Sequence, residues 1–132
     1  MVVVDASVWI ALFREQDKFG EQAKKIFRKI SSDQERISIP AIAFTEVAGV
    51  LRRITKDKNT ARDAVLFMKE MELEVFANFV ELEPVATKIA IHHSIRGADA
   101  YYLAVAEMTR ANFFTFDKLQ AEAFAEMSKA WQ

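Results

Sequence analysis

Met1-Val2-Val3-Val4-Asp5-Ala6-Ser7 opens the chain and decides how the rest of the sequence can fold. Its three consecutive β-branched residues predict a short buried strand. The strand ends at the carboxylate of Asp5, and Ser7 then precedes an apolar run, residues 8–13, that is typical of a helix. A strand followed directly by a helix places Asp5 at the carboxyl edge of a sheet, where open α/β sheets bind their ligands.

The composition is ordinary for a globular protein. The chain has 132 residues, 52% of them hydrophobic and 28% charged, so we expect one domain over residues 1–132 that is long enough to bury its own core. Three glycines and two prolines argue against disorder and against a turn-rich all-β fold. The lack of cysteine excludes disulfides and thiolate catalysis, and it fits a reducing compartment.

The charge and the hydropathy narrow the possible partners. The formal net charge is −1, whereas a simple electrostatic nucleic-acid binder usually has a basic domain. Contact with nucleic acid would therefore need a local basic patch, or metal ions that offset the acids. The apolar run at residues 2–4 has no basic region before it and is too short for a signal peptide, and no apolar stretch approaches the roughly 20 residues of a membrane helix. We therefore expect a cytoplasmic protein with no membrane partner.

Hydrophobic patterning predicts strands that alternate with helices. The expected strands are 2–4, 36–39, 79–82 and 112–116, and the expected helices are 8–14, 18–30, 41–55, 61–76, 84–95, 99–110 and 118–129. Ser7 and Thr60 are suitable N-caps, and Pro40 and Pro84 suit first helical turns. The segment from Glu72 to Phe76 also alternates and could already be extended. This alternation of elements indicates a mainly parallel sheet with helices on both faces.

Four of the 19 acids lie outside polar surroundings. Asp5 and Asp117 each follow an expected strand, and Asp99 lies in the first turn of an otherwise apolar helix. A helix cap or a turn explains each of these three equally well. Glu46 has apolar or small residues three and four positions away, so its carboxylate lies on the buried face of its helix. There it must be protonated, paired or bound to a metal, and an ion pair with Arg53 is the alternative to a metal.

The expected topology brings these acids together. In a parallel sheet the carboxyl ends of the strands and the N-termini of the following helices share one edge, so Asp5, Asp99 and Asp117 converge there and Glu46 can reach the same cleft. Three or four carboxylates cannot all stay ionised side by side without cations. Oxygen ligands without His or Cys suit Mg²⁺ or Mn²⁺ rather than zinc. Such clusters, holding one or two ions, are the usual equipment for in-line attack on a phosphodiester.

The order and spacing of these motifs resemble the PIN domain family, and more narrowly the VapC-like ribonuclease toxins of prokaryotic toxin–antitoxin pairs. The matching segments, which span nearly the whole chain, are Val3-Val4-Asp5-Ala6-Ser7, Thr45-Glu46-Val47 with Leu51-Arg52-Arg53, Gly97-Ala98-Asp99-Ala100-Tyr101-Tyr102-Leu103-Ala104-Val105-Ala106, and Thr115-Phe116-Asp117. Each segment alone is a weak signal, and the ordered set is a strong one.

The resemblance implies a three-layer α/β/α sandwich around a mainly parallel sheet, with Mg²⁺- or Mn²⁺-dependent endoribonuclease activity. It implies that Asp5, Glu46 and Asp99 are catalytic metal ligands and that Asp117 completes the cluster, directly or through water. Family members often carry a further strand after the last helix. Because residues 130–132 show no strand-like run, we expect the last edge of the sheet to be missing or irregular.

The resemblance also implies partners and two neighbouring hydroxyls. Ser7 and Thr115 match small hydroxyl positions beside the metal site, and the alternatives are an N-cap and an ordinary strand residue. VapC-like toxins are typically homodimers held inactive by a small antitoxin whose C-terminal part covers the cleft. We therefore expect an RNA substrate, an antitoxin and a second copy of the chain as partners.

Two sets of residues are candidates for contacts with these partners. The RNA backbone needs basic side chains, for which the candidates are Arg14, Arg52, Arg53, Arg96 and Lys118. An apolar surface for a protein partner, with core packing as the alternative use, would comprise Phe19, Phe27, Phe67, Met68, Met71 and Phe76.

Two other functions remain open on the sequence. The first is a non-catalytic PIN-like scaffold that binds RNA or protein, although a scaffold has no physical reason to keep four mutually repelling acids. The second is phosphoryl transfer with Asp5 as the nucleophile, as in haloacid-dehalogenase-like enzymes. Those enzymes are expected to carry a second acid two residues after the nucleophile, where this chain has Ser7.

Overall fold

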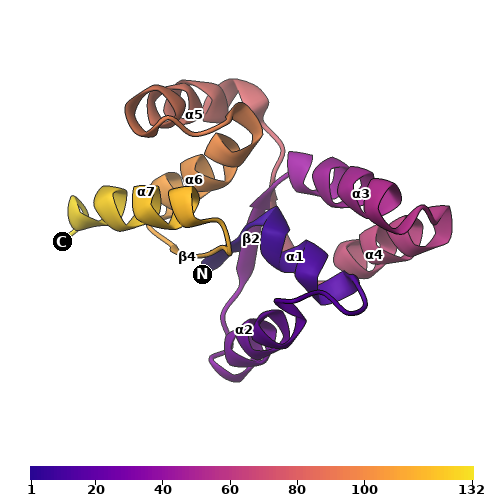
Figure 1. Cartoon of the computed structure of the whole chain (residues 1–132). Coiled ribbons are helices and arrows are strands. Elements are labelled where there is room, and N and C mark those ends of the chain that lie inside the picture. Colours follow the sequence, from indigo (N-terminus) through magenta and orange to yellow (C-terminus); the bar gives the residue numbers. More distant parts are fainter.

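The computed structural model describes all 132 residues as a parallel sheet between helical layers (Figure 1). The strands are β1 (Val2–Val4), β2 (Ile37–Pro40), β3 (Leu73–Phe76) and β4 (Asn112–Phe114). The helices are α1 (Ala6–Phe13), α2 (Gly20–Ser32), α3 (Ile42–Thr55), α4 (Lys58–Glu70), α5 (Phe79–His93), α6 (Gly97–Thr109) and α7 (Lys118–Lys129). In Figure 1, α1, α3 and α4 lie on one side of the sheet and α5, α6 and α7 on the other. The expected α/β/α sandwich is therefore confirmed.

The sheet has four strands in the order β3-β2-β1-β4, and all of its pairings are parallel. Val3 pairs with Ser38 on one side and with Phe113 on the other, so β1 runs through the centre between the second and the last strand. The backbone N–H of Asp5 also donates to the carbonyl of Phe114 at 3.0 Å. The carboxyl ends of β1 and β4 are therefore joined, although their residues are more than a hundred positions apart.

Two elements hold the core around β1. Trp9 of α1 is fully buried, and its indole Nε1 donates to the carbonyl of Val4 at 3.1 Å, which fixes the start of α1 against the end of the strand. Helix α6 is apolar on several sides, and every residue from Tyr102 to Ala106 is buried against β1, β2 and the neighbouring helices. A helix buried in this way brings its first turn, and with it Asp99, to the edge of the sheet.

The third strand lies elsewhere than the sequence predicts. Residues 79–82, expected as a strand, form the first turn of α5, and Pro84 lies inside this helix rather than at its start. Asn78 caps α5, since its side chain accepts from the backbone N–H of Glu81 at 3.2 Å. The third strand is instead Leu73–Phe76, which was the open alternative within the predicted helix 61–76, and it pairs with β2 along its whole length.

Three expected helix starts are also wrong. Asp5, not Ser7, is the N-cap of α1, and Asp57, not Thr60, is the N-cap of α4. In each case the acid lies two or three residues earlier, and the hydroxyl donates to it from within the helix. Pro40 is the last residue of β2, where it pairs with Phe76, instead of opening α3.

The last edge of the sheet ends as expected from the sequence. Residues 130–132 form a turn after α7 and add no strand, so β4 remains the edge. Not one of the helices has both the length and the apolar character that crossing a membrane requires.

Candidate active site

Asp5 lies at the centre of the carboxyl edge of the sheet and is 2% exposed. Its Oδ2 accepts hydrogen bonds from the Ser7 hydroxyl at 2.7 Å, from the Thr115 hydroxyl at 2.9 Å and from the Ser7 backbone N–H at 3.2 Å. Ser7 comes from α1 and Thr115 from the loop after β4, so this carboxylate is held from two sides. The two hydroxyls therefore hold the Asp5 carboxylate in one orientation.

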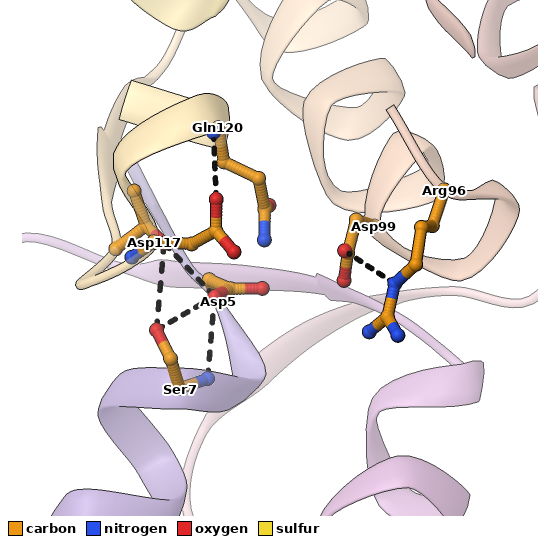
Figure 2. Close-up of polar contacts among 7 residues, drawn as sticks. Asp5, Ser7, Arg96, Asp99, Asp117 and Gln120 are labelled. Atoms are coloured by element: carbon orange, nitrogen blue, oxygen red, sulfur yellow. Dashed lines mark hydrogen bonds and ion pairs between the residues drawn. The ribbon is translucent and has the colours of Figure 1, made fainter. Parts of the chain in front are cut away.

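The same two hydroxyls fix the start of α7. The Ser7 Oγ accepts from the backbone N–H of Phe116 and the Thr115 Oγ1 accepts from that of Asp117, both at 3.0 Å. Asp117 in turn caps α7, since its Oδ1 accepts from the Gln120 backbone N–H at 2.9 Å (Figure 2). We call Asp5, Ser7, Thr115 and Asp117 the fixed half of the site.

Asp99 and Glu46 are held much more loosely. Asp99 is the third residue of α6, its side chain is 14% exposed, and its one partner is the Nε of the exposed Arg96 at 3.4 Å. In Figure 2 the carboxylates of Asp5 and Asp99 point toward each other. Glu46, one turn into α3, has a buried Oε1 that accepts no hydrogen bond. We call Glu46, Asp99 and the neighbouring Tyr102 the open half of the site.

The charges of the two halves act on each other. Burial raises the pKa of Glu46, and the charges of Asp99 and Asp5 raise it further, while Tyr102 and Arg96 oppose the rise. Burial also raises the pKa of Asp99, followed by the charge of Asp5, with Arg96 acting in the opposite direction. The Tyr102 hydroxyl faces Glu46 but misses hydrogen-bonding geometry, and burial keeps it protonated by raising its pKa. The acids that the sequence predicts to converge are thus electrostatically coupled.

All the unpartnered buried polar side-chain atoms of the protein belong to this region. They are Asp5 Oδ1, Glu46 Oε1, Tyr102 Oη and Gln120 Oε1. Buried polar groups in folded proteins nearly always have a hydrogen-bond partner. Their concentration at one edge of the sheet therefore makes this edge the candidate ligand-binding site.

A hard divalent cation fits these residues by its chemistry. Carboxylate oxygens are the ligands that Mg²⁺ and Mn²⁺ prefer, and Asp5 Oδ1 and Glu46 Oε1 have no other partner. As placed, no three acidic or histidine side chains lie close enough together to form a complete ligand set for one ion. A complete ligand set would require the side chains of Glu46 and Asp99 to come closer to Asp5, and these are the loosely held side chains of the site.

Two residues of the region were missed by the sequence analysis as members of the site. Tyr102 stands in an apolar helical run, where a tyrosine is typical of the core. Gln120 is buried at a helix position whose neighbours three and four residues later, Ala123 and Phe124, are apolar. A glutamine on the apolar face of α7 was the one available signal.

The ion pair proposed as an alternative for Glu46 is wrong. Arg53 is exposed in the last turn of α3 and forms no ion pair with Glu46, and Arg96 is the cation that acts on this carboxylate. Of the basic candidates, Arg96 is 87% exposed beside Asp99, and Lys118 is exposed directly after Asp117. Arg14 forms an ion pair with Asp17, with 3.7 Å between Nη1 and Oδ2.

A groove between the last three helices lies away from the acids. It has a volume of about 500 Å³ between α5, α6 and α7, and His92, His93 and Glu107 are among its lining residues. None of the four predicted acids lines it, so the histidines take no part in the acidic cluster. The unpartnered buried oxygens lie with the acids and not in this groove, so the candidate site is the acidic edge of the sheet.

Comparison with known proteins identifies the family of this chain. Residues 2–125 match the PIN domain family. Ribonuclease VapC3 of Pyrobaculum aerophilum is 30% identical to this chain over 128 residues, which cover 93% of this chain and 94% of that protein. The crystal structure of VapC20 of Mycobacterium tuberculosis, a toxin that cleaves the sarcin-ricin loop, matches with a TM-score of 0.80 and 22% identity over 93% of this chain and 95% of that chain. The resemblance inferred from the sequence is thereby confirmed, and the chain belongs to the PIN domain family as a VapC-like member.

Proposed function

We propose that this protein is a divalent-metal-dependent endoribonuclease and the toxin of a toxin–antitoxin pair. The observation that carries the proposal is the gathering of every unpartnered buried polar side-chain atom at one acidic site. Membership of the PIN domain family supports nuclease chemistry, and the relative named Ribonuclease VapC3 supports RNA as the substrate. The fold of VapC20 supports the same architecture around the acids.

Each acid has a distinct part in this proposal. Asp5, Glu46 and Asp99 hold Mg²⁺ or Mn²⁺, and Asp117 completes the cluster directly or through water. Ser7 and Thr115 occupy Asp5 Oδ2, so the other oxygen of that carboxylate stays free for the cation. When bound, the cation supplies a Lewis acid that lowers the pKa of a water ligand and offsets charge on the scissile phosphate.

Basic side chains at the rim bind the RNA backbone in this proposal. Arg96 and Lys118 lie on either side of the acids, at the starts of α6 and α7, and both are exposed. Their charges draw phosphate toward a site whose own charge is negative. Arg96 also partly neutralises Asp99 before the cation is bound.

The proposed partners are an antitoxin and a second copy of the chain, in the cytoplasm. An apolar groove of about 380 Å³ between α1, α2 and α4 supports an apolar protein partner, since it is lined by Leu12, Phe27, Phe67 and Met71 among others. Phe67 is 52% exposed, whereas Met68, which the sequence offered for the same surface, is fully buried in the core.

The proposal is tested by incubating the purified protein with structured and single-stranded RNA in Mg²⁺, Mn²⁺ or EDTA. The Asp5→Asn and Asp99→Asn variants are run alongside, with Asp63→Asn, an exposed acid of α4, as the matched control. We expect internal cleavage of RNA by the unmodified protein and by the control, and none in EDTA or with either site variant. Cleavage that survives EDTA or both site substitutions overturns the proposal. Binding of RNA without cleavage indicates a scaffold, and incorporation of phosphate at Asp5 indicates phosphoryl transfer.

A further inference from the structure

Gln120 is a buried glutamine whose side chain lies within the acidic site. It is the third residue of α7 and is 3% exposed. Figure 2 shows its carboxamide in the space between Asp117, Asp5 and Asp99. Its Oε1 accepts no hydrogen bond, although the atom is shielded from water.

Helix capping does not account for this side chain. A glutamine at the third helical position often reaches back to the backbone N–H of the N-cap residue. In α7 the N-cap is Asp117, whose backbone N–H already donates to the Thr115 hydroxyl at 3.0 Å. The Asp117 side chain accepts from the backbone N–H of Gln120, so the cap is complete without the carboxamide.

Packing does not account for it either. A buried carboxamide with an unpaired oxygen is less favourable than an apolar side chain of the same shape. The third position of a helix readily takes methionine or leucine, which have similar helix propensities. With no partner for its oxygen, the glutamine is therefore less favourable here than methionine or leucine, and a ligand that donates a hydrogen bond to Oε1 would remove this disadvantage.

The chemistry of the carboxamide fits the space around it. A neutral amide offers one acceptor and two donors. It can therefore bind polar ligands without adding a further negative charge to Asp5, Glu46, Asp99 and Asp117. Water ligands of a hard divalent cation, which Mg²⁺ retains in most protein sites, are strong hydrogen-bond donors, and the unpartnered Oε1 of Gln120 is an acceptor.

We propose that Gln120 is a positioning residue of the site, whose carboxamide hydrogen-bonds to water ligands of the divalent cation and fixes them relative to Asp117. This inference rests on the proposed function. Partners of this kind, which contact a metal through its ligands, change metal affinity or activity by about 10–100-fold when they are removed.

The test compares Gln120→Met with Gln22→Met. Gln22 is also the third residue of its helix, α2, but it is exposed, so the pair differs in environment and not in helix position. Binding of Mn²⁺ is measured by titration calorimetry, unfolding is measured in EDTA, and RNA cleavage is measured in Mn²⁺. For Gln120→Met we expect an unchanged or higher melting temperature and about 10-fold weaker Mn²⁺ binding, with a matching loss of cleavage. Gln22→Met should match the unmodified protein in all three.

The outcomes separate this inference from the function on which it rests. If the unmodified protein neither binds Mn²⁺ nor cleaves RNA, the proposed function itself fails. If it does both and Gln120→Met binds Mn²⁺ equally well, the inference about Gln120 alone is overturned. If Gln120→Met lowers the melting temperature in EDTA and leaves the Mn²⁺ affinity unchanged, the role of Gln120 is to stabilise α7, and the inference is overturned.

Discussion

Asp5 and Asp99 face each other in the same site, yet their surroundings differ. Asp5 accepts three hydrogen bonds from Ser7 and Thr115, and it lies at the end of a strand with a neighbour on each side. Asp99 lies in the first turn of a helix and has one contact of 3.4 Å to an exposed arginine. The fixed half is thus built by the fold, whereas the open half keeps side chains that can still turn.

This difference divides the work of the site. In the proposed metal site, the fixed half would set the position of the cation, because Ser7 and Thr115 leave only one oxygen of Asp5 free. The open half would supply the remaining negative charge, and burial raises the pKa values of Glu46 and Asp99, which opposes that charge when no cation is bound. Variants in the two halves should therefore change stability in opposite directions.

The largest effect on stability is expected for Asp5→Ala. The change removes the N-cap of α1, which contributes about 0.5–2 kcal/mol, and it leaves two hydroxyls without their acceptor, at about 1–3 kcal/mol. We expect the free energy of unfolding in EDTA to fall by about 2–4 kcal/mol, measured by urea denaturation. An unchanged midpoint would mean that the hydrogen bonds of Asp5 do not hold the sheet edge together.

A smaller loss is expected for Thr115→Val, which keeps the shape of the side chain and removes its hydroxyl. The hydroxyl donates to Asp5 and accepts from the Asp117 backbone N–H, so its removal should lower the free energy of unfolding by about 1–2 kcal/mol. In a double-mutant cycle, the variant with both Thr115→Val and Asp5→Ala should lose less free energy of unfolding than the sum of the two single losses. Both changes break the same hydrogen bond. Strict additivity would contradict the coupling.

The pH dependence of stability should reveal the open half. Because the folded-state pKa values of Glu46 and Asp99 are raised, the folded protein binds more protons than the unfolded chain between the ordinary and the raised values. The melting temperature in EDTA should therefore fall, by a few °C, as the pH rises through that window, since about 1 kcal/mol corresponds to about 2–8 °C. Saturating Mn²⁺ should reduce or reverse the slope. A melting temperature in EDTA that rises across the same window would contradict the assigned shifts.

Asp99→Asn should stabilise the metal-free protein, in contrast to the changes in the fixed half. The change removes a negative charge that Asp5 repels, and it gives up only a weak contact with the exposed Arg96. We therefore expect the free energy of unfolding in EDTA to rise by up to about 1 kcal/mol. The same variant should lose its stabilisation by Mn²⁺, which a thermal melt with and without the ion measures directly. Destabilisation in EDTA would place Asp99 in the fixed half.

The smallest effect is expected for Tyr102→Phe. The hydroxyl has no hydrogen-bond partner, so its removal should change the free energy of unfolding by less than about 0.5 kcal/mol. Because the Tyr102 hydroxyl faces Glu46 and its dipole favours the ionised carboxylate even without a hydrogen bond, its removal should raise the pKa of Glu46. The variant should then need a higher pH for half-maximal Mn²⁺ binding, as followed by calorimetry across a pH series. Tyr101→Phe, on the preceding residue, is the matched control and should leave that midpoint unchanged.

The parts that the sequence predicts correctly are those set by strong local patterns. A run of β-branched residues before Asp5 and an aromatic run before Asp117 each indicate a strand, and parallel pairing places the carboxyl ends of both strands at one edge. The second strand is shorter than predicted, because β4 ends at Phe114 and residues 115 and 116 lie in the loop that leads to Asp117. The segment 79–82 was misassigned because its apolar residues suit both states. The Asn78 cap and the pairing of Leu73–Phe76 with β2 decide between them, and the second is a tertiary contact.

The open half and Gln120 could not be predicted in the same way. Whether a buried oxygen has a partner depends on atoms brought together from distant segments, as with Asp5 after β1 and Thr115 in the loop after β4. The sequence did indicate that Glu46 and Asp99 reach the cluster. It could not indicate that they stay apart from Asp5 as placed, because side-chain direction is set by packing.

The bond between Thr115 and Asp5 also has a consequence for synthesis. The two residues are 110 positions apart, so the carboxylate gains its second support only after the chain has been extended beyond Thr115. A partly synthesised chain that contains Asp5, Glu46 and Asp99 still lacks β4 and the Thr115 hydroxyl, and both of these hold Asp5 in place. A chain that ends before β4 should therefore cleave no RNA, because Asp5 then lacks both its neighbouring strand and its second hydroxyl partner.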